Sequence, residues 1–267
     1  MTKTPDWVPE GVEVNVPNVA RMYDYVLGGY HNFAVDREFA EQIEKLAPGS
    51  TAIARANRAF VRRSVRWLMA AGIRQFLDIG SGIPTLGTVH EIAQSVAPES
   101  KVVYVDVDPV AVAHSKAILA GNSRAEVLRA DIRQPAEILD DDRVTALLDF
   151  GQPVAVLLNA VLHFVSDADD PAGIIGLIRQ EMVGGSYLTI THGNRDGGDR
   201  NSQTETGEVL DRTPTSIHLR GADELAALVA GMEVVEPGIV PVTDWHPEPD
   251  NDDSPQPGVL AVVARQP

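Results

Sequence analysis

Two short apolar runs in the sequence, at residues 76–85 and 101–109, each end in a polar turn. The first turn carries Gly80 and Gly82 ahead of a helical pattern, and the second run closes on Asp106. An α/β sheet holds an adenosyl group with such a strand, glycine turn, helix and second strand. The glycines let backbone N–H groups approach the ligand, and the acid accepts hydrogen bonds from ribose hydroxyls. This pattern predicts an adenosyl site in an α/β fold.

From residue 74 onward, strand-like runs alternate with helical stretches. The runs are near-continuous in Val, Ile and Leu, as in parallel strands covered on both faces, and the helices supply the crossovers that parallel pairing requires. A turn-rich segment without a crossover helix joins the last two runs, so we expect the last strand to be antiparallel. The prediction is a Rossmann-like, doubly wound, seven-stranded, mostly parallel sheet. Strands are expected at residues 75–79, 101–105, 125–129, 154–158, 186–191, 233–240 and 259–265, and helices near 85–96, 109–119, 137–148 and 171–182.

Three helical patterns precede this sheet, separated by turns at residues 28–29 and 48–49. We expect residues 1–72 to form a helical N-terminal cap or lid and residues 73–267 to form the adenosyl-binding core, in one compact unit. Polar and aromatic residues crowd around the flexible Gly28-Gly29 pair, which is at odds with a plain amphipathic helix. Such a segment can close over a pocket and exclude water.

The composition of the chain limits the classes of molecule that it can bind. The chain has 267 residues, a formal net charge of −16 and no cysteine. The charge works against binding to nucleic acid or anionic membranes, and the lack of cysteine excludes disulfides and thiolate metal sites. No run resembles a signal peptide or approaches the ~20 apolar residues that cross a bilayer, so we expect a cytoplasmic protein. One local basic series is most simply a solvated helix face: Arg55, Arg58, Arg62, Arg63 and Arg66.

The glycine turn departs from the dinucleotide-binding pattern. That pattern is Gly-x-Gly-x-x-Gly, whose third glycine lets helix and strand pack closely, whereas Thr85 stands at the third position here. Pro84 precedes it, and we place this proline at or near the first helical turn, where its missing N–H costs nothing. The spacing Asp78-x-Gly80-x-Gly82 instead resembles that of class I S-adenosylmethionine (SAM) methyltransferases, whose cofactor has no pyrophosphate.

That resemblance assigns roles to the turn itself. In the family, the leading acid helps to orient the amino-acid end of SAM. Asp78 suits this role because SAM carries an ammonium and a sulfonium; alternatively, Asp78 only caps the turn at the end of the strand. Gly80, Ser81 and Gly82 are the candidates for the backbone cradle.

The acids after the second strand are candidates for the ribose. Asp106 closes the strand and is the first candidate for the 2′- and 3′-hydroxyls, with Val107 beside it. Asp108 is the alternative, although Asp108-Pro109 looks like a helix N-cap followed by proline at the first helical position.

Two further strand ends complete the candidate cofactor site. Asp131 follows the third strand, where an acid reaches the adenine amino group in the methyltransferase family and an apolar neighbour, here Ile132, packs on the ring. Alternatively, Asp131 is a turn aspartate. Asn159 and Ala160 end the fourth strand, beside the methyl-bearing end of the cofactor.

The whole chain also resembles a narrower group, the S-adenosyl methyltransferases long catalogued as a domain of unknown function and common in actinobacteria. The residues that carry this resemblance are 17–36, 78–85, 161–165 and 236–238. It implies a SAM-binding Rossmann-like core with the N-terminal segment folded over the cofactor. It implies no particular acceptor.

Arg21 and Tyr23 lie in the distinctive N-terminal string and are candidate cofactor contacts. Arg21 could pair with the SAM carboxylate in a charge-assisted contact. It could equally pair within the chain, with Asp24 or Asp36, and the sequence leaves this choice open.

Two histidines follow strands at the edge where ligands bind in open α/β folds. His163 lies just beyond the fourth strand and His192 ends the fifth. Either could serve as a general base, which is needed only if the acceptor loses a proton during attack, or could be a hydrogen-bonded structural residue. The other histidines are scattered and indicate no metal site.

The leading hypothesis is a SAM-dependent methyltransferase that acts on a small molecule. One alternative is a SAM-binding protein without transferase activity, acting as a sensor or interaction module. A nicotinamide-dependent oxidoreductase is disfavoured by Thr85, and a nucleic-acid methyltransferase by the missing Asn/Asp-Pro-Pro-aromatic sequence after the fourth strand. The acceptor, the methylated atom and the oligomeric state are not readable from the sequence.

Overall fold

A mixed sheet organises the chain in the computed structural model, which describes residues 8, 12–84, 87–197, 216–248 and 255–267. The strand order is β3-β2-β1-β4-β5-β8-β6, and β7 also pairs with β8. The first five strands are parallel, and β8 runs antiparallel to β5. This confirms the Rossmann-like fold and the antiparallel last strand. The strands are β1 (Gln75–Ile79), β2 (Lys101–Asp106), β3 (Ala125–Arg129), β4 (Ala155–Asn159), β5 (Tyr187–Gly193), β6 (Glu233–Val234), β7 (Val240–Pro241) and β8 (Val259–Arg265).

The strand count differs from the prediction, because the run at 233–240 is not one strand. It is split into β6 and β7, so the described part of the sheet has eight strands and not seven. Pro237 lies between the two pieces and has no N–H to donate to a ladder, and Gly238 adopts a φ of 98°. Both pieces pair antiparallel with β8.

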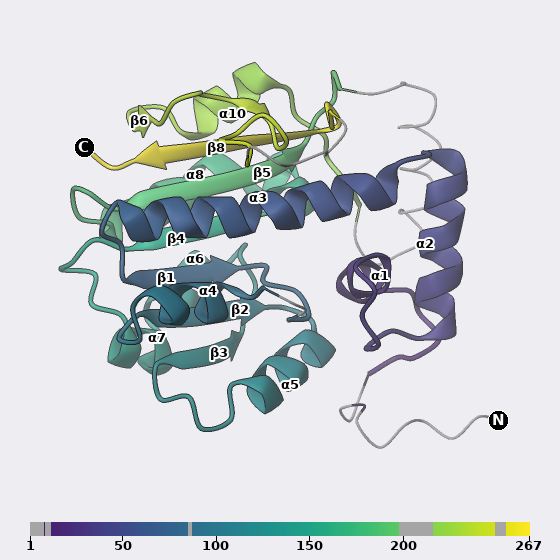
Figure 1. Cartoon of the computed structure of the whole chain (residues 1–267), viewed down its shortest axis with the longest axis horizontal. Coiled ribbons are helices and arrows are strands. Elements are labelled where there is room, and N and C mark those ends of the chain that lie inside the picture. Colours follow the sequence, from purple (N-terminus) through teal and green to yellow (C-terminus); the bar gives the residue numbers. More distant parts are fainter. Residues whose placement is uncertain (1–7, 9–11, 85–86, 198–215, 249–254) are drawn as a thin grey trace.

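Helices cover both faces of the sheet (Figure 1). Apolar residues of α3, α4 and α5 share one core cluster with alternate strand residues such as Phe76, while α6, α7, α8 and α10 join the other cluster with residues such as Leu77. None of the described helices is long and apolar enough to cross a bilayer. The helices are α1 (Val19–Val26), α2 (Ala34–Leu46), α3 (Ser50–Ala70), α4 (Val89–Val96), α5 (Pro109–Ile118), α6 (Pro135–Leu139), α7 (Asp142–Leu147), α8 (Pro171–Glu181) and α10 (Ala222–Leu228), with 3-10 turns η1 (Leu162–Phe164) and η2 (Asp167–Asp169).

Two helix predictions were wrong at their boundaries. The helix expected at 137–148 is two helices, because the Asp141 side chain accepts a hydrogen bond from the Arg143 N–H and caps α7 as a new start. The helix expected from residue 85 begins only at Val89, where Thr88 and Glu91 form a capping box. Pro84 therefore lies before the helix and not in its first turn, and Thr85 lies outside the described residues.

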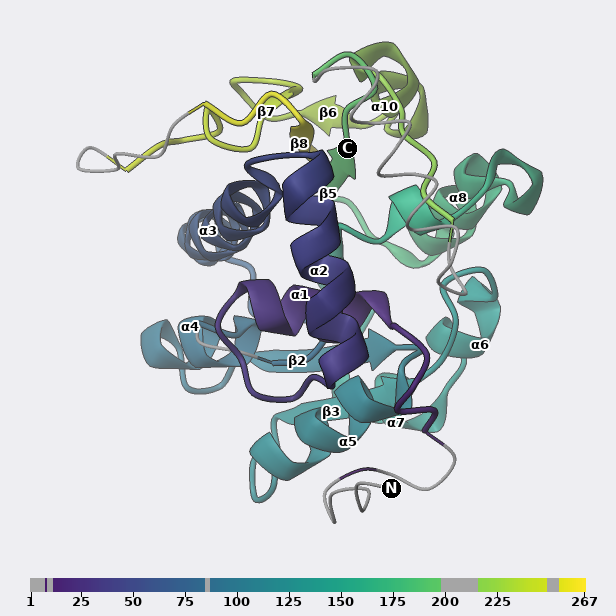
Figure 2. The same cartoon turned by 90° about the vertical axis from the view of Figure 1, so that its right-hand side faces the viewer.

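The N-terminal cap, defined here as α1 and α2, lies beyond the carboxyl ends of the parallel strands (Figures 1 and 2). The ring of His31, between the two helices, lies with its centroid 3.6 Å from that of His114 on α5. By contrast, α3 runs along the sheet and contributes Phe60 and Leu68 to the core. The domain boundary at residue 72 stays a prediction, and α3 packs with the strands that follow it.

Phe60 is a direct test of how α3 stabilises the sheet. Its side chain is fully buried, and its ring meets that of Trp245 edge-on, with 5.3 Å between centroids. Phe60→Ala should lower the free energy of unfolding by about 3–5 kcal/mol, because the deletion leaves a cavity in the core. Urea unfolding measures this, with Val96→Ala on the exposed face of α4 as control. Equal midpoints for the two variants would contradict the packing described.

Candidate functional site

The candidate site lies where the strand order reverses, between β1 and β4, at the carboxyl ends of the strands. Ligands bind at this switch point in open α/β sheets. The glycine loop that follows β1 turns over the end of β2, because the N–H groups of Gly80 and Ser81 both donate to the carbonyl of Val105, at 2.8 and 3.1 Å. The loop backbone is thereby fixed in place at the switch point.

Both glycines of the loop are required by its geometry. Gly80 and Gly82 have φ angles of 75° and 66°, in the left-handed region that other residues rarely adopt. A Cβ on Gly80 would also lie 2.5 Å from Cγ2 of Val161. Among the residues that the structure describes, nothing lies within 4 Å of a Cβ built on Gly82, so the backbone angle is what favours glycine there.

Asp106 ties the two turns of the site together. Its Oδ2 accepts the Gly82 N–H at 2.6 Å, and its Oδ1 accepts the Asp108 N–H at 2.8 Å. The side chain is buried, and burial raises the pKa of Asp106 to about 6 despite these hydrogen bonds. A carboxylate has about four lone-pair sites, so both oxygens can also accept ligand hydroxyls.

Asp78, the last polar residue of β1, is a second buried carboxyl beside the loop. Burial, helped by the negative charge of Asp106, raises the pKa of Asp78 to about 7, while the charge of Arg58 opposes this shift. Asp78, Arg58 and Ser81 line one cavity with Gly82 and Tyr104. The Ser81 hydroxyl is buried and makes no hydrogen bond within the described part of the chain, so it is available to a ligand.

Asp108 is confirmed as a helix cap. Its Oδ1 accepts the N–H groups of Val110 and Ala111, at 2.6 and 3.0 Å, and Pro109 stands in the first turn of α5. The other oxygen of Asp108 lies 4.0 Å from Nη1 of Arg21. Of the two ribose candidates, Asp106 is the one with an oxygen bonded to the glycine loop.

Arg21 takes one of the alternative partners named from the sequence. Its Nε donates to Oδ2 of Asp36 at 2.9 Å, and its Nη2 donates to the carbonyl of Val16 at 2.6 Å. Tyr23 joins α1 to α3: its hydroxyl donates to the carbonyl of Ala54 at 3.0 Å and accepts from Asn57 at 2.9 Å. Both residues hold the cap in place, and contact of either with the cofactor stays a prediction.

The three candidate contacts for adenine differ in how accessible their side chains are to a ligand. Asp131 forms a two-pronged ion pair with Arg133, which lowers the pKa of Asp131. Ile132 is buried in the core, whereas Val107 is 58% exposed. Val107 therefore offers the larger free apolar surface for a ring, and Asp131 would have to share its carboxylate with Arg133.

Asn159 and Ala160 end β4 on the other side of the switch point. Ala160 has a φ of 55°, and its N–H donates to the hydroxyl of Thr191 at 2.8 Å. Oδ1 of Asn159 accepts the Thr189 hydroxyl at 3.2 Å, while its buried Nδ2 has no hydrogen-bond partner among the residues that the structure describes. That amide is a free donor at the edge of the site.

The rings of His163 and His192 lie close together, with centroids 5.7 Å apart, but their nitrogens differ in hydrogen bonding. Nε2 of His192 lies 3.0 Å from Nη1 of Arg220, and Nδ1 lies 2.9 Å from the carbonyl of Gly193. Because a guanidinium only donates, Nε2 accepts and Nδ1–H donates. Burial lowers the pKa of His192 to about 4. Both ring nitrogens are thus occupied, which argues for a structural role and against a general base.

His163 is the better-placed candidate base. It lies in η1, directly after β4, and its Nδ1 is buried without a hydrogen-bond partner in the described part of the chain. Burial, together with the nearby His192 and Arg220, lowers the pKa of His163 to about 3. The ring is therefore neutral at physiological pH and can accept a hydrogen bond from an acceptor.

Two arginines of the site were missed from the sequence. Arg58 was assigned to a solvated helix face, yet it is half-buried and lines the cavity with Asp78; Arg63 of the same series is 6% exposed and donates to carbonyls at Val242 and Trp245. Arg220 is buried and clamps η1 by donating to the carbonyls of Leu162 and Val165. The helical spacing of Arg58 and Arg62 was the only signal, and it does not say which face is buried.

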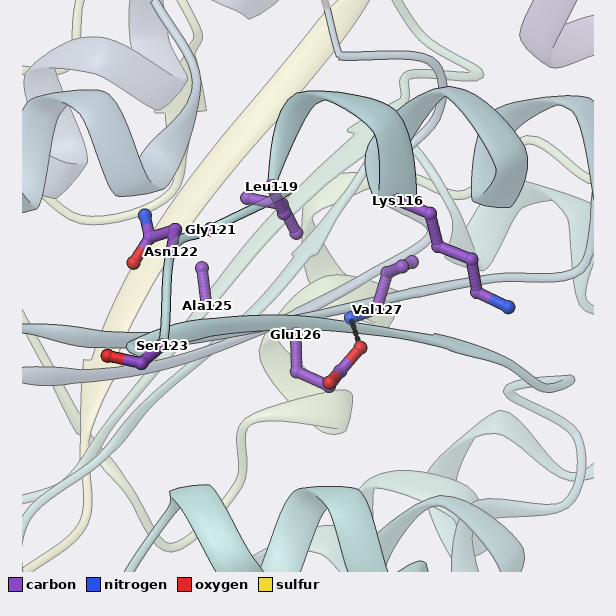
Figure 3. A pocket seen from close by; sticks show the side chains of 8 residues that line it. All are labelled: Lys116, Leu119, Gly121, Asn122, Ser123, Ala125, Glu126 and Val127. Carbon is purple, nitrogen blue, oxygen red and sulfur yellow. Dashed lines mark hydrogen bonds between the residues drawn. The ribbon is translucent and has the colours of Figure 1, made fainter.

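Another hollow lies far from this edge, between the end of α5 and the start of β3 (Figure 3). Lys116, Leu119 and Glu126 are among its lining residues. Since Ala125 begins β3, this hollow is at the amino end of the parallel strands. Open α/β sheets bind ligands at the opposite end.

The fold and the site together define the class of protein. A glycine loop fixed to the end of β2, with a buried acid that closes β2 and a second buried carboxyl in β1, suits a positively charged adenosyl ligand at a switch point. That combination is characteristic of SAM-dependent methyltransferases with a Rossmann-like core.

Comparisons with known proteins identify the family. The family model described as S-adenosyl methyltransferase matches residues 5–267, and the chain belongs to this family. The structure is similar to that of a DUF574 family protein from Streptomyces avermitilis MA-4680, with 38% identity, a TM-score of 0.91, and coverage of 96% of this chain and 100% of that one. It is also similar to a candidate methyltransferase from Thermobifida fusca YX, with 37% identity, a TM-score of 0.91, and coverage of 98% and 99%. No curated protein matches the chain.

Asp78 gives SAM binding a predicted dependence on pH. In the unliganded protein its pKa is about 7, and a sulfonium and an ammonium nearby would lower that pKa, because opposite charges favour the carboxylate. Binding near neutral pH should therefore release a proton, and SAM affinity should rise as the pH increases through about 7 and level off above it.

Calorimetry of SAM binding at neutral pH, in buffers with different ionisation enthalpies, measures this proton release. Asp78→Asn should abolish the dependence on buffer, while Asp140→Asn, at an exposed position, should keep it. A binding enthalpy that is the same in all buffers for the wild-type protein would contradict the charged state assigned to Asp78.

Proposed function

We propose that this SAM-dependent methyltransferase transfers the methyl group to a small-molecule acceptor, and that Asp78, the glycine loop and Asp106 hold the cofactor. The observation that carries the proposal is the pair of buried carboxyls on either side of the loop, whose pKa values are raised to about 7 and about 6. Burial destabilises their charged forms, and a cationic ligand bound beside them would stabilise those forms. SAM is a cation at its sulfonium.

The cofactor contacts follow from the placement of each group. Asp106 would accept the ribose hydroxyls and Val107 would lie on the adenine. Asp78 would face the ammonium, with Gly80, Ser81 and Gly82 as the backbone cradle. The further candidates Asp131, Ile132, Asn159 and Ala160 surround the same edge and remain proposals, as do Arg21 and Tyr23.

The start of α4 supports a nucleoside over a dinucleotide. Dinucleotide folds place a pyrophosphate on the free N–H groups of a helix N-terminus. Here Oε2 of Glu91 accepts the N–H groups of Gly87 and Thr88, at 3.1 and 2.9 Å, so a carboxylate already covers this end of α4. A pyrophosphate would meet like charge there and at Asp78, which disfavours a nicotinamide cofactor.

For methyl transfer, the protein must chiefly align the acceptor with the methyl group and exclude water. When bound, SAM supplies a methyl group activated by its sulfonium. The cap lies over this edge of the sheet (Figure 2) and would shield it from solvent. His163, neutral because burial lowers its pKa, would accept a hydrogen bond from the acceptor and orient it, while Arg220 would keep η1 and His192 in position around it. A pKa of about 3 makes the ring a weak base, which favours this positioning role over removal of a proton.

A small acceptor agrees with the formal net charge of −16, which repels nucleic acid. A cytoplasmic location stays a prediction. Formation of S-adenosylhomocysteine on addition of metabolite extracts would distinguish a transferase from a protein that only binds SAM, because binding alone consumes no cofactor.

Asp106→Asn tests the cofactor assignment. The variant should bind SAM at least about tenfold more weakly than wild type, since hydrogen bonds to a charged group contribute about 1.5–3 kcal/mol each. Isothermal titration with SAM and with NAD measures both affinities, and Asp140→Asn is the matched surface control. Tighter binding of NAD than of SAM, or an unchanged SAM affinity in Asp106→Asn, would refute the proposal.

A further inference from the structure

Arg58 and Asp78 present opposite charges to the same cavity. Arg58 projects from α3, Asp78 is the last but one residue of β1, and both line the space beside Ser81 and Gly82 of the glycine loop. The positive charge of Arg58 acts on two other residues that line this cavity, because it favours a lower pKa for both Asp78 and Tyr104. A guanidinium and a carboxyl on two walls of one cavity suit a ligand group that is itself a zwitterion.

Arg21, the arginine singled out from the sequence, is committed elsewhere. It is 4% exposed, pairs with Asp36 at 2.9 Å and lies 4.0 Å from Asp108, so two carboxylates already balance its charge. Its guanidinium carbon also lies 5.1 Å from the centre of the Phe33 ring. A third carboxylate would have to displace these contacts, which join α1 to α2 and α5.

Arg58 also lies where the cap, α3 and the glycine loop meet. The neighbouring Asn57 donates to the Tyr23 hydroxyl of α1 at 2.9 Å, and the charge of Arg58 acts on Tyr23 as well. One turn further along α3, Arg62 lies beside Gly87, which precedes α4: a Cβ built on Gly87 would lie 3.0 Å from the Cδ of Arg62. Residues four apart share a helix face, so this face of α3 lies near Ser81 and Gly82 through Arg58 and near Gly87 through Arg62.

We propose that Arg58 binds the carboxylate at the methionine end of the cofactor, while Asp78 faces the ammonium, and that Arg21 only braces the cap. This inference rests on the SAM function and adds a specificity determinant to it. The two opposite charges would recognise the intact amino-acid end, so the site would discriminate against adenosyl sulfonium compounds that lack the carboxylate. Planar guanidinium groups suit this role because they can bind a carboxylate through two parallel hydrogen bonds.

Titration with SAM and with decarboxylated SAM tests the assignment, because the two ligands differ only in the carboxylate. Wild type should prefer SAM by about tenfold or more, the value of a charge-assisted hydrogen bond. Arg58→Gln should weaken SAM binding by a similar factor and leave decarboxylated SAM unchanged or slightly tighter, since a positive charge is removed beside a dication. Arg58→Lys should keep part of the preference. Arg55→Gln, at an exposed position one turn earlier on α3, is the control.

Three results would overturn the inference: equal weakening of both ligands in Arg58→Gln, an absence of preference in wild type, or loss of the preference in Arg21→Gln but not in Arg58→Gln. Each of these leaves SAM binding by the wild-type protein intact. If wild type bound neither ligand, the cofactor assignment itself would fail, so the two failures are distinguishable in the same titrations.

Discussion

The carboxylate of Asp106 connects the parts of the molecule on which the site depends. One oxygen holds the glycine loop after β1 and the other holds the turn after β2, through the N–H groups of Gly82 and Asp108. The second turn continues into α5, which Asp108 caps. Without this carboxylate, two neighbouring strands would still pair, but the loops at their carboxyl ends would lose their common anchor. In the proposed function, the group that shapes the loop would also bind the ribose.

The buried acids at the carboxyl edge of the sheet favour binding of a cationic ligand. Raising the pKa of Asp78 from 3.8 to about 7 destabilises its charged form by on the order of 4 kcal/mol. Native proteins maintain such costs mainly at functional sites. The charge of a sulfonium cofactor would offset part of this cost on binding. Two other features favour SAM over a dinucleotide. Arg58 suits a carboxylate on the ligand, and the Glu91 carboxylate at the start of α4 would repel a pyrophosphate.

Much of this was predictable because the deciding interactions are local. The runs that form β1 and β2 are mostly apolar, and Asp108-Pro109 carries its own capping chemistry. The wrong element boundaries have causes in turns and in tertiary structure. Asp141 starts a new helix inside an expected one, and the proline-glycine turn at 237–238 splits an expected strand. The partner of Arg21 depended on how α1 crosses α2. Arg58 could not be distinguished from its solvated neighbours until α3 was placed against the glycine loop.

The most direct test of the central claim is a crystal structure of the protein with S-adenosylhomocysteine. The account predicts that the ribose hydroxyls lie within hydrogen-bond distance of Asp106 and that the amino-acid end lies between Asp78 and Arg58. A nucleoside bound away from the end of β2, for example in the hollow beside Lys116 and Glu126, with Asp106 still bonded only to its backbone partners, would contradict it.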